Sequence, residues 1–305
     1  MRRFLALSRT SHGLLDVAMP GFAALLWLGH FPALSVLVVA LVTAVAGYTA
    51  IYALNDLVGV RVDREKFSQA GPNPGYAVES SGLRYPLARG KLDMGRALAW
   101  FGVWYLIALA GAWWLNPLLV CVVLAAAALE IIYCLLLKTS WLRIFVSGLV
   151  KATGPVAAVL VVVPHPSLPL LALMIAWLMA WEIGGQNIPA DWNDVEEDRL
   201  IGAKTIPVLF GPQRAGRIIA ATLVLAVTVS LFLPTMSPLP LGWPWHIANL
   251  TAGTFLLLIP ALQLLRHQTS SHAARLFDRA SHYPVAMLGI ITVFVLLEAF
   301  MGKAV

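Results

Sequence analysis

The stretch "VLVVALVTAVAGYTAIYALNDLVGVRVDRE" (residues 36–65) is predominantly apolar up to Leu54 and becomes polar beyond it. Apolar runs of about 20 residues, the length of a membrane-spanning helix, recur along the chain. The 305 residues are 60% hydrophobic and only 12% charged. Since a soluble domain of this length cannot bury so much apolar surface, the sequence predicts an all-α polytopic membrane protein.

Nine segments are apolar and long enough to be membrane-spanning helices. They cover residues 14–31, 36–58, 97–115, 117–137, 144–164, 168–188, 217–234, 245–265 and 283–301. We expect residues 1–305 to form a single domain. Cys121 and Cys134 both lie inside these segments, which argues against a disulfide framework or a zinc site.

The positively charged residues predict the orientation of these helices. If the N-terminus is cytosolic, all but Lys151 and Lys303 of the 21 Lys and Arg residues fall on the cytosolic side. We therefore expect a multi-pass protein of a bacterial inner membrane, with its N-terminus and long loops in the cytosol. The formal net charge of +6 then reflects topology, and the expected partner is the lipid bilayer, not nucleic acid.

Two long polar loops, residues 59–96 and 189–216, each follow an acidic cluster. The first cluster, "NDLVGVRVD" (55–63), ends the second segment, and the second, "QNIPADWNDVEEDR" (186–199), ends the sixth. Four spans separate the clusters, so both return to the same membrane face. Because long loops in compact proteins are commonly functional, we expect a site at this face.

Helical spacing places the polar side chains of each cluster on one face. These are Asn55, Gly59 and Asp63 in the first cluster and Asp191, Asp194 and Asp198 in the second, with Asn187 added if Pro189 does not break the helix. So many carboxylates need cations, and Mg²⁺ binds oxygen ligands while leaving places for phosphate oxygens. Basic residues lie nearby in the sequence: Arg64, Lys66, Arg84, Arg89, Lys91, Lys138, Arg199 and Lys204. Together they predict a magnesium site for a diphosphate whose lipid tail enters the helical bundle.

A solvated helix end is the competing interpretation, because acidic residues commonly mark one. For either cluster alone, the two interpretations are equally good. Two clusters at helical spacing on the same side of the membrane favour a binding site.

The two clusters resemble the motifs of the UbiA superfamily of intramembrane prenyltransferases. That family carries N-D-x-x-D-x-x-x-D after its second helix and D-x-x-D-x-x-x-D after its sixth, where this chain has "NDLVGVRVD" (55–63) and "DWNDVEED" (191–198). "RYPLARGK" (84–91), "YCLLLK" (133–138) and "DRLIGAKTIPVLFG" (198–211) are similar to less specific family segments. The resemblance covers nearly the whole chain.

The resemblance implies nine transmembrane helices around a central cavity that takes a polyprenyl diphosphate, beneath a cytosolic cap. Two Mg²⁺ ions would bridge the diphosphate to the acidic motifs. The implied activity is Mg²⁺-dependent prenyl transfer to a small or lipophilic acceptor, which we expect to be aromatic, with release of diphosphate. The expected catalytic residues are Asp56, Asp63, Asp191 and Asp198, and the expected metal ligands are Asn55, Asp63, Asp191, Asp194 and Asp198. The expected substrate-binding residues are Asn55, Arg64, Arg84, Lys138, Lys151, Glu182, Asn187 and Lys204.

Gly59 departs from the family pattern, because it stands where the first motif has its middle Asp. A metal carboxylate is therefore missing. Four consequences stay open at this point: a weaker metal site, a different preferred metal, a specialised subfamily, or a family member that has lost catalysis.

Glu130 and Lys151 lie inside the fourth and fifth segments, almost equidistant from the connecting "TSW" turn (139–141). At a rise of 1.5 Å per residue each lies about 12 Å inward, so we expect the two charges to face each other. The structural interpretation is a buried ion pair. In the functional interpretation, Lys151 binds an acidic acceptor or Glu130 acts as a base, while Glu182 orients the acceptor.

A membrane transporter and a catalytically impaired, isoprenoid-binding family member are the alternative functions. Transporters place their sites near the membrane midplane on broken helices, whereas both acidic clusters here lie at the cytosolic rim. The segment "EIGGQNIP" (182–189) is the feature that favours a broken helix. Transport predicts solute flux without release of diphosphate.

Overall fold

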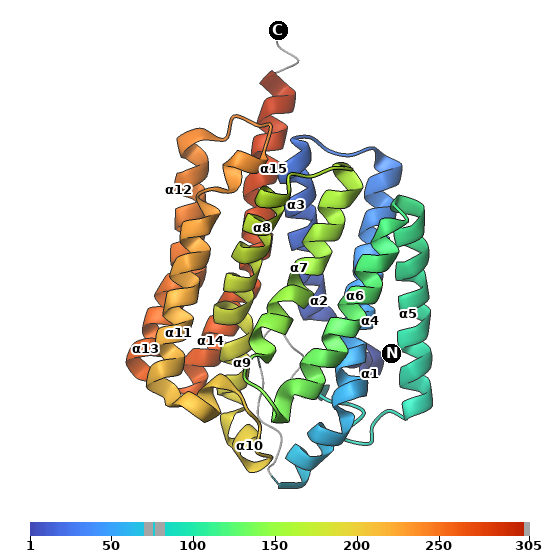
Figure 1. Cartoon of the computed structure of the whole chain (residues 1–305), viewed down its shortest axis with the longest axis vertical. Coiled ribbons are helices and arrows are strands. Elements are labelled where there is room, and N and C mark those ends of the chain that lie inside the picture. Colours follow the sequence, from blue (N-terminus) through green and yellow to red (C-terminus); the bar gives the residue numbers. More distant parts are fainter. Residues whose placement is uncertain (70–75, 77–82, 302–305) are drawn as a thin grey trace.

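The computed structural model describes residues 1–69, 76 and 83–301, which form helices and turns and contain no strand. The long helices run side by side along the longest axis of the molecule (Figure 1). The short helix α10 (Val195–Leu200) lies at the lower end in this view, and α15 (Tyr283–Met301) reaches the upper end. This all-helical architecture confirms the predicted fold class.

The remaining helices follow one another with short connections, except for the long connection between α4 and α5. They are α1 (Arg2–Leu7), α2 (Thr10–Asp16), α3 (Ala18–Leu28), α4 (Leu34–Gln69), α5 (Met94–Leu115), α6 (Leu118–Leu135), α7 (Arg143–Val162), α8 (Leu168–Trp181), α9 (Ile188–Asn193), α11 (Ile206–Ser230), α12 (Gly242–Gly253), α13 (Ile259–His267) and α14 (Ser270–Ser281). Short 3₁₀ or π segments join some of them: η2 (Leu136–Lys138), η3 (Glu182–Asn187), η4 (Leu233–Met236) and η5 (Thr254–Leu258).

Eight helical stretches of the described chain are long and apolar enough to cross a membrane. They are Thr10–Leu28, Leu34–Ser68, Met94–Leu115, Leu118–Lys138, Arg143–Val162, Leu168–Asn193, Gly242–His267 and Ser270–Met301. The predicted span 217–234 falls mostly in α11, which is not among the eight and is interrupted at Gly211 (φ 74°) before Pro212. The count of nine spans therefore stays a prediction.

The length of α4 explains how the first acidic motif leaves the membrane. The helix has 36 residues and so extends about 54 Å, well beyond a hydrocarbon core of about 30 Å. Asn55 and Asp63 lie on its second half and continue the helix without a break. Gly59 and Asp63 share one face of this helix as predicted, because a Cβ on Gly59 would lie 3.2 Å from Asp63 Oδ2.

The segment before the second motif continues as a π-helix instead of unwinding. α8 passes through η3 into α9, with Pro189 in the first turn of α9. The first turn of a helix tolerates proline, which lacks a backbone N–H, so the chain stays helical from α8 to α9. Gly184 and Gly185 permit close packing here, because a Cβ on them would lie 2.3 Å from Thr222 Oγ1 and 2.9 Å from Ala280 Cβ. Asn187 is thereby kept buried and close to the second motif.

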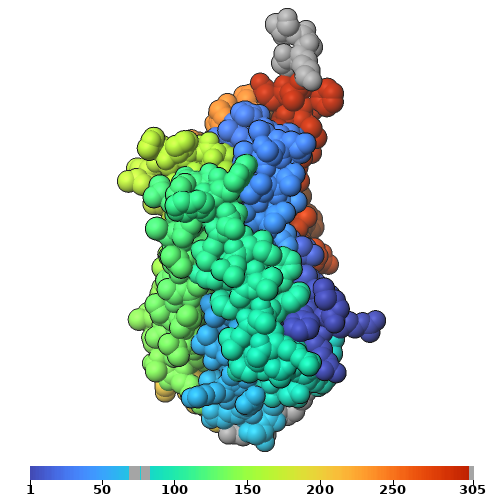
Figure 2. Space-filling model, turned by 90° about the vertical axis from the view of Figure 1, so that its right-hand side faces the viewer, coloured from blue at the N-terminus to red at the C-terminus, as the bar shows by residue number. Residues whose placement is uncertain are grey.

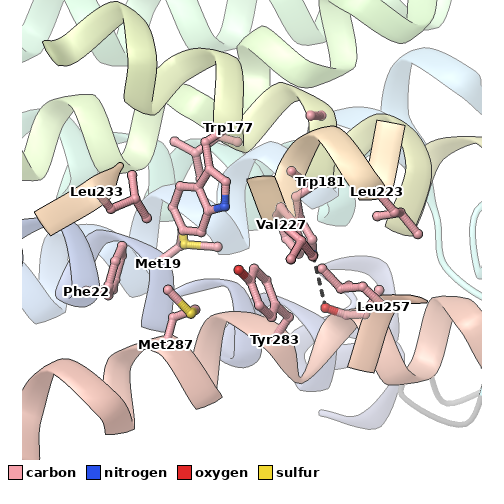
Figure 3. Close-up of a cluster of buried hydrophobic side chains, with 14 of the residues drawn as sticks. Met19, Phe22, Trp177, Trp181, Leu223, Val227, Leu233, Leu257, Tyr283 and Met287 are labelled. Carbon is pink, nitrogen blue, oxygen red and sulfur yellow. Dashed lines mark hydrogen bonds between the residues drawn. The ribbon is translucent and has the colours of Figure 1, made fainter. Parts of the chain in front are cut away.

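Large apolar side chains fill one half of the bundle and also cover its outside. Met19, Phe22, Trp177, Tyr283 and Met287 pack together in the main core, between α3, α8 and α15 (Figure 3). The outer face of α5, which is prominent in Figure 2, exposes further apolar residues to the surroundings. These include Leu98, Val103, Leu106 and Trp113. An apolar exterior of this kind suits contact with lipid.

Candidate active site

The two acidic motifs meet at one end of the bundle. Lys66, three residues beyond Asp63 on α4, forms an ion pair with Asp198 on α10 (Nζ–Oδ1 2.5 Å). Arg84, in the connection after α4, forms an ion pair with Asp194 (3.5 Å). The convergence expected from the four-span separation is therefore confirmed.

The connection between α4 and α5 covers this end of the bundle. The Tyr76 hydroxyl donates to the Ala190 carbonyl at 2.9 Å, and its ring stacks on Phe277 at a centroid distance of 4.0 Å. The Arg84 guanidinium lies over the rings of Tyr76 and Tyr85, at 5.1 and 4.9 Å. These contacts form the predicted cap, of which residues 70–75 and 77–82 lie outside the described residues.

Arg143, at the start of α7, holds the first carboxylate of the second motif. It donates to Asp191 Oδ1 at 3.0 Å, and its guanidinium lies 4.0 Å from the centroid of the Tyr133 ring. The Tyr133 hydroxyl accepts a hydrogen bond from Asn187 Nδ2 at 2.9 Å. Asp191 Oδ2 is buried and has no hydrogen-bond partner among the described residues. This oxygen is therefore available to a ligand.

We call the carboxylates Asp63, Asp191, Asp194 and Asp198, together with the cations beside them, the acidic rim. Burial of these side chains determines their electrostatics. Burial raises the pKa of the Asp198 carboxyl above its ordinary value, and the neighbouring Lys66 opposes that shift. Burial also raises the pKa of Tyr85 to about 12, so this hydroxyl stays neutral at physiological pH. The ionised form of Asp198 thus depends on cations next to it.

The oxygen donors at the rim suit a hard divalent cation that is shared with a ligand. Asp63, Asp191, Asp194 and Asp198 supply carboxylate oxygens of the kind that Mg²⁺ prefers. Within the described part of the chain, no three His, Cys, Asp or Glu side chains lie close enough to hold a metal ion. Lys and Arg side chains neutralise the three carboxylates of the second motif. A divalent ion would therefore exchange with these cations and complete its ligand shell with phosphate and water oxygens.

Asn55 and Asp56, at the start of the first motif, face Arg9. Arg9 donates to Asn55 Oδ1 at 3.0 Å, while Asn55 Nδ2 donates to Glu130 Oε1 at 2.6 Å. Asp56 forms an ion pair with Arg9 (3.4 Å) and lines a separate pocket of about 290 Å³ with Arg84. The metal-binding role of Asn55 and the catalytic role of Asp56 stay predictions.

The predicted substrate-binding cations differ in where they lie. Arg84 contacts the acidic rim directly. Lys138 pairs with Glu65 of α4 (2.7 Å), beside the rim. The side chains of Arg64 and Lys204 are exposed. The structure thus brings Arg84 and Lys138 towards the motifs and leaves Arg64 and Lys204 on the surface, while the fifth predicted cation, Lys151, lies in the cavity wall.

An apolar cavity of about 720 Å³ extends from the rim into the bundle. Asn55, Tyr133 and Asn187 line one polar part of its wall, Lys151 and Glu182 belong to another, and aliphatic side chains of α3, α4, α6, α7 and α15 line most of the remainder. The carboxylates Asp63 and Asp191 lie outside its wall. The acidic rim therefore lies next to one end of a largely apolar cavity, which suits a ligand with a charged head and an apolar tail.

The predicted pairing of Lys151 with Glu130 is wrong. Lys151 Nζ instead donates to Asp16 Oδ2 at 2.5 Å and lies 4.0 Å from Glu182 Oε2. Glu130 accepts a hydrogen bond from Asn55. The two side chains therefore have different partners, and the expected Lys151–Glu130 ion pair is not formed. The functional interpretations, an acid-binding Lys151 and a basic Glu130, were alternatives to this pairing and stay predictions.

Sequence reasoning missed Arg9 and Arg143 as parts of the site. Both lie near the ends of predicted spans, where the positive-inside rule already accounts for a basic residue. Their spacing from the acidic motifs along the chain carries no signal. The one available indication is that Arg143 lies close in sequence to "YCLLLK", the segment noted for its family resemblance.

Comparison with known proteins identifies the architecture. The model of the UbiA prenyltransferase family matches residues 17–288. The chain belongs to the UbiA prenyltransferase family. A digeranylgeranylglyceryl phosphate synthase of Thermococcus kodakarensis is 28% identical over 223 residues, which cover 71% of this chain and 72% of that protein.

Solved UbiA homologues share the fold. The apo structure of a homologue from Aeropyrum pernix aligns with a TM-score of 0.71 at 18% identity, covering 92% of this chain and 97% of that one. A homologue from Archaeoglobus fulgidus, solved with DMAPP and Mg²⁺, gives a TM-score of 0.67 at 16% identity, covering 95% and 99%. As a UbiA family member the chain is a prenyltransferase, and this assignment favours an enzyme over a transporter.

Proposed function

We propose that this UbiA family member catalyses the Mg²⁺-dependent transfer of a prenyl group from a polyprenyl diphosphate to a hydrophobic acceptor, with release of diphosphate. The observation that carries the proposal is the convergence of two acidic motifs, through the Lys66–Asp198 ion pair, at the entrance of an apolar cavity. The Archaeoglobus homologue supports it, because its structures hold DMAPP or GPP together with Mg²⁺.

In this proposal, Asp63, Asp191, Asp194 and Asp198 hold the metal ions. Bound Mg²⁺ supplies positive charge that stabilises the diphosphate leaving group. Arg84 and Lys66 already lie against these carboxylates, so they are placed to contact phosphate oxygens once a metal ion takes their partners. The protein thereby gathers positive charge where negative charge develops.

The cavity below the rim would shield the allylic carbon from water. Its wall contains the rings of Tyr48, Tyr52, Tyr105 and Tyr133 among aliphatic side chains. Aromatic faces stabilise positive charge, and an apolar chamber excludes competing water. The same rings favour an aromatic acceptor, which we retain as the proposed acceptor class.

Turnover by the purified protein tests the proposal. With Mg²⁺, prenyl diphosphates of several lengths and a panel of acceptors, we expect release of diphosphate and a prenylated product by mass spectrometry. Chelation by EDTA should abolish both, because the diphosphate then lacks its counter-charge. Solute flux across vesicles without diphosphate release would support a transporter instead. Prenyl diphosphate binding without any turnover would indicate an impaired family member.

Replacing Gly59 with Asp should lower the Mg²⁺ concentration needed for half-maximal prenyl diphosphate binding severalfold. The substitution restores a carboxylate one turn from Asp63, whose flexible end can shift by the few tenths of an ångström that the new Cβ requires. Gly59→Ala is the matched control. It should leave the Mg²⁺ requirement unchanged and stabilise the helix by about 0.5–1 kcal/mol. An equal response of both variants would remove Gly59 from the metal site.

A further inference from the structure

A second group of polar side chains lies deep in the cavity, away from the acidic motifs. We call it the deep polar cluster; its members are His12, Asp16, Tyr52, Ser147, Lys151 and Glu182. Tyr52 and Lys151 both donate to Asp16 Oδ2, and Lys151 also donates to the Tyr52 hydroxyl at 2.9 Å. All members except Asp16 line the cavity wall. The cluster therefore faces whatever molecule occupies the cavity.

The deep polar cluster is separate from the proposed diphosphate site. Glu182 precedes Asp191 by nine residues on one continuous helical path, which places it on the order of 10 Å further into the bundle. A π-helical turn, a feature frequent at functional sites, begins at Glu182. The proposed chemistry at the rim leaves this carboxylate without a role.

The charges around the cavity leave an excess of carboxylates. Among the cations in its wall, Arg9 pairs with Asp56 and Lys151 with Asp16. His12, also in the wall, lies 3.7 Å from Asp16, the partner of Lys151. Glu130 and Glu182 are the carboxylates in the cavity wall itself. An anionic ligand would be repelled here, because charges interact strongly where water is excluded.

Two carboxylate oxygens in the cluster, Asp16 Oδ1 and Glu182 Oε2, have no hydrogen-bond donor among the described residues, and of these two residues only Glu182 lines the cavity. Glu182 Oε1 accepts a hydrogen bond from Ser147 Oγ at 2.6 Å. Glu182 Oε2 is buried, has no hydrogen-bond partner among the described residues, and lies at the ion-pair limit of 4.0 Å from Lys151 Nζ. A buried acceptor without a donor is costly, so a ligand that supplies one is favoured.

We propose that the deep polar cluster binds a neutral, hydrogen-bond-donating hydroxyl group of the acceptor, through Glu182 Oε2, and discriminates against carboxylate acceptors. This inference rests on the proposed prenyl transfer and narrows its aromatic acceptor to one with a neutral hydroxyl group, such as a phenol. Lys151 does not serve as an anion clamp, because Asp16 and Tyr52 hold its ammonium group. Glu182 acts as a binding residue that positions the acceptor.

A purely structural role for the cluster makes a different prediction. The cluster links α2, α4, α7 and η3, and such a link would be indifferent to the chemistry of a ligand. Ligand selectivity therefore separates the two roles. A matched pair of probes that differ only in the head group, an alkylphenol and the corresponding alkylbenzoate, measures it.

The experiment is a calorimetric titration of both probes into the full chain in nanodiscs, with empty nanodiscs subtracted to remove partitioning into lipid. We expect wild type to bind the alkylphenol at least about tenfold more tightly, as a hydrogen bond to a charged group provides. Glu182→Gln should remove this preference, because it removes the negative charge and keeps the side-chain shape. Glu196→Gln, the same change on an exposed side chain of α10, should retain it.

Equal or tighter binding of the alkylbenzoate by wild type would overturn the inference, and this measurement does not depend on whether the variant folds. An unchanged preference in folded Glu182→Gln would overturn it as well. Mg²⁺-dependent binding of a prenyl diphosphate is measured in the same nanodiscs. If that binding is present while the phenol preference is absent, only the acceptor inference fails. If that binding is absent, the proposed function itself fails.

Discussion

Replacing Asp198 with Asn is expected to reduce prenyl transfer by about a hundredfold or more while the protein remains folded. Asp198 is 1% exposed and, through Lys66, connects the second motif to the first. Asn keeps the size of the side chain but removes the charge that a divalent ion requires. Asp191→Asn should act in the same way, because Asp191 Oδ2 is buried without a hydrogen-bond partner in the described structure.

The measurement is the rate of diphosphate release at saturating Mg²⁺, together with calorimetric binding of the prenyl diphosphate. Loss of both in Asp198→Asn, with an unchanged melting temperature, separates a metal-site defect from unfolding. Glu196→Gln is the control, because Glu196 is acidic, lies two residues away and is 76% exposed. Wild-type rates in Asp198→Asn would contradict the assignment of the acidic rim.

The acidic rim was largely predictable because it depends on periodicity and on counting. A 3.6-residue period places Asn55 and Asp63 on one face of α4, and an even number of spans returns both motifs to one end. The cations that hold the motifs were not predictable in the same way. Arg143 reaches Asp191 through tertiary packing of α7 against η3 and α9, and sequence separation does not encode that contact.

The helical path before the second motif could not be predicted from the sequence either. Two glycines and a proline in residues 184–189 are compatible with a broken helix and with a continuous one. The structure has a continuous helical path, in which the two glycines pack closely against Thr222 and Ala280 and Pro189 lies in the first turn of α9, after the π segment. Local propensity did not distinguish a broken helix from a continuous one here, and tertiary contacts favour the continuous helix.

The depth of charged residues was predictable from helix rise, but their partners were not. Rise per residue fixes how far Lys151 lies from the helix end, and it carries no information on the direction in which the side chain points. That direction depends on how α7 is rotated against α2, α3 and α6. Lys151 consequently meets Asp16, which lies 135 positions away in the sequence.

Replacing Lys151 with Met is expected to destabilise the protein by about 3–5 kcal/mol, the cost of leaving buried carboxylates without their cation. Lys151 is 14% exposed, and its partners Asp16 and Glu182 are 1% and 5% exposed. Met preserves most of the apolar stem, so the lost charge dominates the effect. The measurement is the free energy of unfolding in mixed micelles, from titration with a denaturing detergent.

A second substitution identifies the partner that matters. Asp16→Asn in the Lys151→Met background should recover more than half of the lost stability, because it removes the carboxylate that loses both its ion pair and a hydrogen bond. Glu130→Gln in the same background should recover nothing, since Glu130 bonds to Asn55. If Glu130→Gln rescued Lys151→Met and Asp16→Asn did not, the partner of Lys151 would be Glu130, as helix rise alone suggests. Because the two rescues differ only in which carboxylate is neutralised, the comparison isolates the direction of the Lys151 side chain.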